Sequence, residues 1–205
     1  MRRIIKAVAA LALLGVVCLA PRAHAGFVGL PNMLRGQLQK IALGGPTLAP
    51  FAHTRFCMQY PGDCASSHNR FRPGPIALDE TRFSELRDLN HEINQSIRFE
   101  RNVDGIAGER WLIGPDRGDC NDYAVTKRHA LIARGWPAHA LLLAEVVTTW
   151  GEHHLVLVVR TKKGDLVADS IAQDIRPWAK SPYQWVRIQS PKTPTFWAMV
   201  GKTQA

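Results

Sequence analysis

Hydrophobic residues recur at helical spacing over residues 79–100, which predicts a long helix. The positions on one face of this helix are Phe83, Leu86, Ile93 and Ile97. The polar run Asn90-His91-Glu92 falls between them, and we expect it to face solvent. Residues 26–76 are rich in Pro and Gly and show little periodicity, which predicts irregular structure wrapping the domain. Glycines and a proline also interrupt residues 102–116, which predicts a loop.

A second predicted helix begins close to Cys120 and precedes a series of strands. Asp119 is a suitable N-cap, Asp122 can support the first turn, and Gly135 supplies the C-terminal stop. Compact apolar runs with strand character follow at residues 141–147, 154–160, 166–171 and 185–189. The second of these runs is apolar on both faces, which predicts a central strand. One helix followed by an antiparallel meander indicates the α+β fold class.

The turn between the second and third predicted strands decides which residue faces His154. A hairpin centred at 161–162 places His154 opposite Asp169. A turn centred at 163–164 places it opposite Gln173 instead, and both registers stay open. Asp169 is the only acid in an apolar strand and needs a partner, because burying an unpaired carboxylate is costly. The imidazole of His154 is a suitable partner.

The first 25 residues have the parts of a secretory signal peptide. A positively charged start precedes an apolar stretch over residues 7–20, and Ala23-His24-Ala25 matches the A-x-A cleavage pattern. The apolar stretch is short for a membrane span, so we expect cleavage near Ala25 rather than an uncleaved anchor. The expected mature chain, residues 26–205, is a single domain that is periplasmic or secreted and is not an integral membrane protein.

Composition places the 205-residue chain among ordinary globular proteins, with 46% hydrophobic and 21% charged residues. The formal net charge is +9, and part of it belongs to the basic start of the leader. No run of Lys and Arg forms the basic stripe typical of nucleic-acid binding, so we expect no nucleic-acid partner. A mildly basic exported protein is suited to the anionic polymers of a cell envelope.

Three cysteines follow the predicted cleavage point, and an exported chain meets an oxidising compartment. Cys57 and Cys64 bracket a Pro-Gly turn, which favours a disulfide between them over two free thiols. Cys120 is then left without a partner. An unpaired cysteine is often an inert buried residue, but the neighbours of Cys120 favour a reactive one.

Cys120 falls at the predicted helix N-terminus, where the helix dipole and free N–H groups lower the pKa of a thiol. The same N–H groups can stabilise an oxyanion on an attacked carbonyl. His154 opens the predicted central strand and is the candidate base. His153 is a rival for this role. Trp111 is either a wall of the site or a core residue, and His129 is expected to be exposed.

The order of these residues resembles the bacterial transglutaminase-like cysteine proteinases, within the wider transglutaminase/papain-like superfamily. The matching segments are Gly118-Asp119-Cys120-Asn121-Asp122-Tyr123, then His154-Leu155-Val156-Leu157, then Leu166-Val167-Ala168-Asp169. The resemblance implies a papain/transglutaminase-like core, with the nucleophile at a helix N-terminus packed on an antiparallel sheet. It implies an exported thiol peptidase acting on a protein or peptide of the cell envelope. In the implied triad Cys120 forms an acyl-enzyme, His154 transfers the proton, and Asp169 fixes the imidazole tautomer. His154 is preferred over His153 because it directly precedes the strand in the matching motif.

One branch of the family comprises LapG-type periplasmic proteases, which cut surface adhesins, depend on calcium, and have acids on both sides of the nucleophile. Asp119 matches the first acid, but Asn121 replaces the second. An asparagine can supply a carbonyl oxygen but lacks the charge, which weakens Ca²⁺ binding. We therefore expect no cofactor beyond weak calcium binding near Asp119 and Asp122.

Other functions are compatible with the same residues. An NlpC-type peptidoglycan peptidase also uses an Asp-Cys helix start and a strand histidine, although such proteins typically carry Ser-Gly where this chain has Asn121-Asp122. A transglutaminase or amidase would form the same acyl-enzyme. A non-catalytic envelope-binding domain would keep the fold without the reaction.

Overall fold

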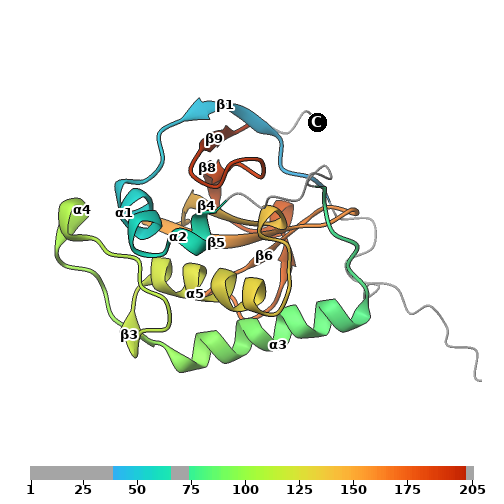
Figure 1. Cartoon of the computed structure of the whole chain (residues 1–205), viewed down its shortest axis with the longest axis horizontal. Coiled ribbons are helices and arrows are strands. Elements are labelled where there is room, and N and C mark those ends of the chain that lie inside the picture. The colour runs from blue at the N-terminus through green and yellow to red at the C-terminus, as the bar shows by residue number, and fades with distance from the viewer. Residues whose placement is uncertain (1–38, 66–73, 202–205) are drawn as a thin grey trace, which may run out of the picture.

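A seven-stranded antiparallel sheet lies at the centre of the computed structural model, which describes residues 39–65 and 74–201 (Figure 1). The strand order across the sheet is β1-β9-β8-β4-β5-β6-β7. The strands are β1 (Leu43–Thr47), β4 (Leu141–Val147), β5 (His153–Arg160), β6 (Asp165–Ala168), β7 (Arg176–Pro177), β8 (Gln184–Gln189) and β9 (Trp197–Val200). Every neighbouring pair is antiparallel. The predicted meander is confirmed for β4, β5 and β6, but it was wrong for the fourth predicted strand, because β8 pairs with β4 and not with β6.

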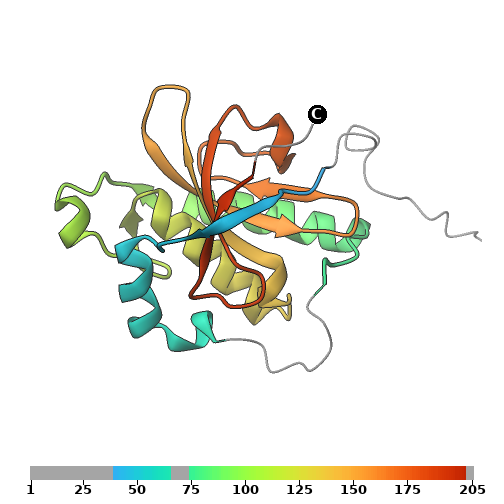
Figure 2. The ribbon, with the colours of Figure 1, turned by 90° about the horizontal axis from the view of Figure 1, so that it is seen from above.

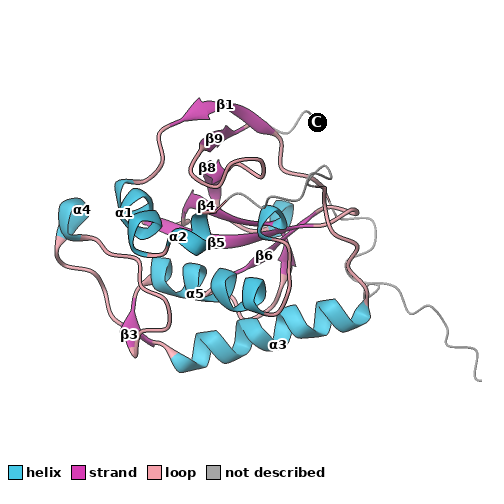
Figure 3. Cartoon of the chain, viewed as in Figure 1, coloured by secondary structure: helices cyan, strands magenta, loops and turns pink. Residues whose placement is uncertain are grey.

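Two long helices form successive layers against the sheet, and the mixture of helix and antiparallel sheet confirms the α+β prediction (Figures 1 and 3). Helix α5 (Cys120–Ala133) packs on β5, and α3 (Glu80–Ser96) packs on α5. The shorter elements are α1 (Phe51–Gln59), α2 (Pro61–Cys64), α4 (Gly105–Gly108), the 3₁₀ turns η2 (Ala138–Ala140) and η3 (Trp178–Lys180), and the parallel pair β2 (Arg98–Phe99) and β3 (Arg117–Gly118).

Buried side chains cover both faces of the central strands. Toward α5, Leu143 of β4 and Leu157 of β5 belong to the larger hydrophobic cluster. On the opposite face, Leu142 and Val158 pack in a second cluster that includes Trp178 of η3. Because both faces are covered, β5 is apolar at consecutive positions, and it is the central strand that this run predicted.

Helix α3 begins where the sequence predicted but ends earlier. Asp79 is its N-cap and accepts a hydrogen bond from the N–H of Arg82. The chain becomes extended at Ile97, and the expected last turn instead forms β2. The expectation that Asn90 faces solvent was wrong. This side chain is fully buried, and its amide donates to the carbonyl of Gln173 at 2.7 Å.

The expectation of irregular structure over residues 26–76 was wrong for much of the described part. The segment contains β1, α1 and α2, and β1 pairs with β9 at one edge of the sheet (Figure 2). An exposed edge strand shows no inward–outward alternation, which explains the missing period in the sequence. A Cβ at Gly44 would lie 3.1 Å from the carbonyl oxygen of Met199, so this close approach favours glycine.

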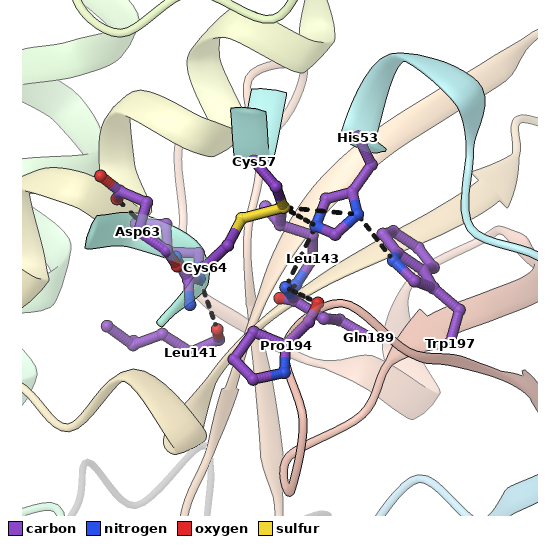
Figure 4. Close-up of a disulfide and its surroundings, with 10 residues drawn as sticks. His53, Cys57, Asp63, Cys64, Leu141, Leu143, Gln189, Pro194 and Trp197 are labelled. Atoms are coloured by element: carbon purple, nitrogen blue, oxygen red, sulfur yellow. Dashed lines mark hydrogen bonds and ion pairs between the residues drawn. A yellow bond between two sulfur atoms is a disulfide. The ribbon is translucent and has the colours of Figure 1, made fainter. Parts of the chain in front are cut away.

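The predicted disulfide between Cys57 and Cys64 is present and joins α1 to α2, with the Cα atoms 5.4 Å apart (Figure 4). His53 lies beside it, and its Nδ1 accepts a hydrogen bond from the indole N–H of Trp197 at 3.2 Å. Burial, assisted by the charge of Arg128, lowers the pKa of His53 to about 4. The imidazole is therefore neutral at pH 7 and acts as a core residue.

The register between β5 and β6 differs from both predicted registers. Leu157 pairs with Ala168 and Arg160 with Asp165, so the hairpin is centred between the two alternatives. Strand β6 ends at Ala168, three residues before the end of the predicted strand. Asp169 therefore lies just past the strand end, where its side chain is not bound by the inward–outward alternation of the sheet.

The predicted signal peptide, residues 1–25, lies outside the described residues. Within the described part of the chain, none of the helices has the length and hydrophobicity needed to cross a membrane.

Candidate active site

Cys120 is the first residue of α5, as the sequence predicted. Asp119 caps this helix by accepting the N–H of Asn121 at 2.9 Å, and Asp122 accepts the N–H of Asp119 at 3.0 Å. The same Asp122 carboxylate accepts the N–H of Leu112 at 2.7 Å. The two acids thus form a capping box that fixes the helix start and ties it to the preceding loop.

His154 and Asp169 form a buried hydrogen-bonded pair next to this helix start. The Nε2 atom of His154 lies 2.7 Å from Oδ1 of Asp169, and the two side chains are 4% and 1% exposed. The second carboxylate oxygen, Oδ2, accepts the hydroxyl of Tyr183 at 2.5 Å. Because Nε2 is engaged by Asp169, Nδ1 is the imidazole nitrogen left for exchanging a proton with another group.

Hydrogen bonding keeps Asp169 ionised in spite of its burial. Burial alone would raise the pKa of this carboxyl group, but the hydrogen bond and charge of His154, followed by the hydroxyl of Tyr183, lower it below its ordinary value. The N–H of Ile171 also donates to Oδ1 at 3.1 Å. A carboxylate with this set of donors remains charged at neutral pH and can stabilise an imidazolium.

The expectation of a lowered thiol pKa at Cys120 was wrong. Burial, followed by the charge of Asp119, raises the pKa of Cys120 to about 12. Glu109 and Asp122 act in the same direction, and the N–H of Leu155 opposes them. Loss of hydration and three nearby acids therefore favour the neutral thiol over the thiolate.

Two cavities meet at Cys120 and His154, and both residues line each of them. The larger cavity has a volume of about 710 Å³ and carries the exposed apolar side chains of Phe99, Trp150 and Ile171 on its walls. The smaller has a volume of about 380 Å³.

The rival histidine points elsewhere. The side chain of His153 is 71% exposed, and its Nδ1 lies 2.6 Å from Oε1 of Glu145. Consecutive residues of a strand face opposite sides, so only one of the two histidines can meet Asp169. Trp111 is a core residue that is 2% exposed, and it also lines the smaller cavity. His129 is exposed, as expected, and its ring contacts Asp63.

Sequence reasoning missed three polar residues around the site. Tyr183 reaches Asp169 from the segment before β8, and no motif marked it. Glu109 accepts hydrogen bonds from the side chains of Trp111 and Asn121 at 3.1 and 2.6 Å. Lys127 is buried on α5 two turns after Cys120, and its position inside an apolar helix face was the signal that could have identified it.

The residues beside Cys120 do not fit a calcium site in this arrangement. Both oxygens of Asp122 accept backbone N–H groups, and one oxygen of Asp119 does the same. Asn121 has no charge, and its amide group donates to Glu109. These side chains are therefore occupied in holding the helix start and the adjoining loop rather than arranged as free oxygen ligands.

Among the described residues, one group of three side chains lies close enough to share a metal ion: His53, Cys57 and Cys64. Two of these three form the disulfide, which removes their thiolates as ligands. The closeness of these three side chains is thus explained by the disulfide.

A family model and several solved structures match this chain. The family model described as bacterial transglutaminase-like cysteine proteinase matches residues 43–205. The calcium-bound LapG of Legionella pneumophila has a similar fold, with a TM-score of 0.50 and 23% identity over 63% of this chain and 74% of that chain. A second LapG structure from the same organism is 24% identical over 58% of this chain and 70% of that chain, with a TM-score of 0.48. The search of curated proteins found no match.

Proposed function

The chain belongs to the bacterial transglutaminase-like cysteine proteinases, and on that basis we propose that it is an exported thiol peptidase whose triad is Cys120, His154 and Asp169. One observation carries the proposal. A free thiol at a helix N-terminus adjoins a cavity that also contains a buried histidine, and that histidine is held by a carboxylate 2.7 Å away. This is the set of parts that acyl transfer through a cysteine needs.

In the proposed reaction, Sγ of Cys120 attacks the carbonyl carbon of a substrate amide while Nδ1 of His154 takes the thiol proton. The oxyanion that forms is stabilised by the backbone N–H of Cys120 at the start of α5. His154 then gives its proton to the departing amine, and the C–N bond breaks to leave a thioester. Water, activated by the same imidazole, hydrolyses the thioester and restores the thiol.

The neutral resting thiol defines the role of the histidine. With a pKa of about 12, Cys120 does not lose its proton unaided at neutral pH. His154 therefore acts as a general base during the attack, and Asp169 stabilises the imidazolium that results.

The proposed substrate is a protein or peptide of the cell envelope, and the proposed location is the periplasm or the cell exterior. The leader at residues 1–25 supports this location, since its sequence has the pattern of a signal peptide. N-terminal sequencing of the exported protein tests it and should begin at Gly26. An N-terminus at Met1 in the exported fraction would contradict cleavage.

Labelling of Cys120 with iodoacetamide tests the triad without a known substrate. The rate is read on the Cys120 peptide by mass spectrometry, so that other thiols do not contribute. At pH 7, His154→Ala should slow labelling by about 10²-fold or more, because the base is absent. Asp169→Asn should leave the fold intact and slow it less, because the neutral amide can hold the wrong tautomer.

His153→Ala is the matched control, since it removes an adjacent imidazole from the same strand. Its labelling rate should stay close to that of the wild type. Fast labelling in His154→Ala together with slow labelling in His153→Ala would refute the proposed base and withdraw Asp169 as its partner.

A further inference from the structure

Asp169 is held from both sides, and the second side is not explained by the triad. Its Oδ1 binds His154 and the N–H of Ile171, whereas its Oδ2 accepts the hydroxyl of Tyr183 at 2.5 Å. Resting on the proposed function, we propose that Tyr183 is a positioning residue, which holds the Asp169 carboxylate and through it the His154 imidazole in the orientation needed to deprotonate Cys120.

The ring of Tyr183 also contacts the histidine directly. The ring centroids of Tyr183 and His154 are 5.7 Å apart with an interplanar angle of 63°, an edge-to-face arrangement. Tyr183 therefore touches both members of the pair, the carboxylate through its hydroxyl and the imidazole through its ring. One side chain that fixes two partners restricts rotation of the imidazole about the Nε2–Oδ1 hydrogen bond.

The position of Tyr183 is itself fixed by packing on the far face of the sheet. It follows η3 and precedes β8, and it packs against the cluster that contains Trp178. The indole of Trp178 donates to the carbonyl of Gln39 at 3.0 Å, and its ring meets that of Trp185 edge-to-face at 5.5 Å. Tyr183 thus lies in the connection between η3 and β8 and is held there by packing against buried side chains.

The hydroxyl has a specific task because Oδ2 is buried. Asp169 is 1% exposed, so without Tyr183 this oxygen would lose a charge-assisted hydrogen bond that water cannot readily replace. The tyrosine stays a donor at neutral pH, since burial and the nearby Asp169 carboxylate raise its pKa. Other charged groups act on these residues, namely Lys127 on Asp169, Arg176 on Tyr183 and Asp119 on His154.

Tyr183→Phe tests the inference, because it removes the hydroxyl and keeps the ring against His154. We expect labelling of Cys120 at pH 7 to slow by about tenfold, the effect of losing one hydrogen bond to a charged group. The acid limb of the pH–rate profile should move to higher pH, because a carboxylate with one donor fewer is a stronger partner for the imidazolium. Tyr60→Phe, which removes a hydroxyl from the α1–α2 region, is the control. It should change neither the labelling rate nor the position of the acid limb.

A double-mutant cycle separates positioning from a general structural effect. In an Asp169→Ala background, Tyr183→Phe should slow labelling by less than about twofold, because the side chain that accepts the hydroxyl is absent. A tenfold effect in both backgrounds would overturn the inference, since Tyr183 would then act without Asp169. No effect in the wild-type background would also overturn it, while slow labelling in His154→Ala would still support the triad. Fast labelling in His154→Ala would instead refute the proposed function.

A second variant keeps the test decisive if Tyr183→Phe folds poorly. Incorporation of 3,5-difluorotyrosine at position 183 retains the ring and the hydroxyl and makes the O–H a stronger donor. The acid limb should then move to lower pH, opposite to the shift expected for Tyr183→Phe. A profile identical to the wild type would overturn the inference.

Discussion

Lys127 is a buried cation with no hydrogen-bond partner, and replacing it should stabilise the protein. Its side chain is 1% exposed, and Nζ makes no hydrogen bond within the described structure. The ammonium lies 5.9 Å from the centre of the Tyr123 ring, which compensates only weakly for lost hydration. Burial lowers the pKa of Lys127 to about 7, although the charge of Asp169 opposes this shift.

The pKa sets the size of the expected effect. The pKa of Lys127 is about 7 in the folded protein and 10.5 in the unfolded chain, so the two values differ by about 3.5 pH units. Between these values the unfolded chain binds more protons, so wild-type stability rises with pH across this range. Burial of Lys127 therefore lowers the free energy of unfolding by about 4 kcal/mol at pH 7 and by about 1 kcal/mol at pH 10.

Lys127→Met removes the charge and keeps a flexible apolar side chain of similar length. The free energy of unfolding, measured in urea by tryptophan fluorescence, should increase by about 2–4 kcal/mol at pH 7 and by under about 1 kcal/mol at pH 10. Lys163→Met, in the exposed turn between β5 and β6, is the control and should change it by under about 0.5 kcal/mol at either pH. An equal gain at both pH values, or a loss at pH 7, would refute the reasoning.

Three further predictions concern the disulfide, calcium dependence and the cap of helix α5. Cys57→Ser with Cys64→Ser should lower the free energy of unfolding by about 2–3 kcal/mol, measured by urea unfolding, because the loop closed by the disulfide is short; an unchanged value would mean that the disulfide does not constrain the unfolded chain. Addition of EGTA should shift Tm by less than about 2 °C, because Asp119 and Asp122 are occupied by N–H donors. A large decrease in Tm that calcium restores would contradict this prediction. In that case Asn121→Asp should strengthen calcium binding. Asp122→Ala should lower the free energy of unfolding by about 1–2 kcal/mol, because the capping box is lost. An unchanged unfolding curve would show that the capping box does not contribute to stability.

The start of helix α5 could be predicted from the sequence, because its capping residues are close together in the chain. An acid before Cys120 and another two residues after it predict a capping box, and the structure has that box with the thiol at the first helical position. The continuous apolar run of β5 likewise predicts a central strand, and both faces of that strand are buried. Such signals survive in the sequence because they involve residues within a few positions of one another.

Contacts between distant segments could not be predicted in the same way. The register of the β5–β6 hairpin fell between both predicted alternatives, because turn geometry and the early end of β6 set it rather than the hydrophobic pattern. Strand β1 was missed because an exposed edge strand has no alternation to detect. The thiol pKa was expected to fall and is raised instead, since burial depends on what packs around Cys120.

The sequence by itself determined the class of fold and the candidate residues of the site, because periodicity, caps and the order of Cys120, His154 and Asp169 are properties of the chain. Only the tertiary structure decided how these groups meet. It placed Asp169 past the end of its strand within 2.7 Å of His154, and it brought Tyr183 from the C-terminal segment onto the other oxygen. The physical reason is that a hydrogen bond and the burial of a charge depend on distances in space, which the packing of sheet and helices sets and local sequence does not record.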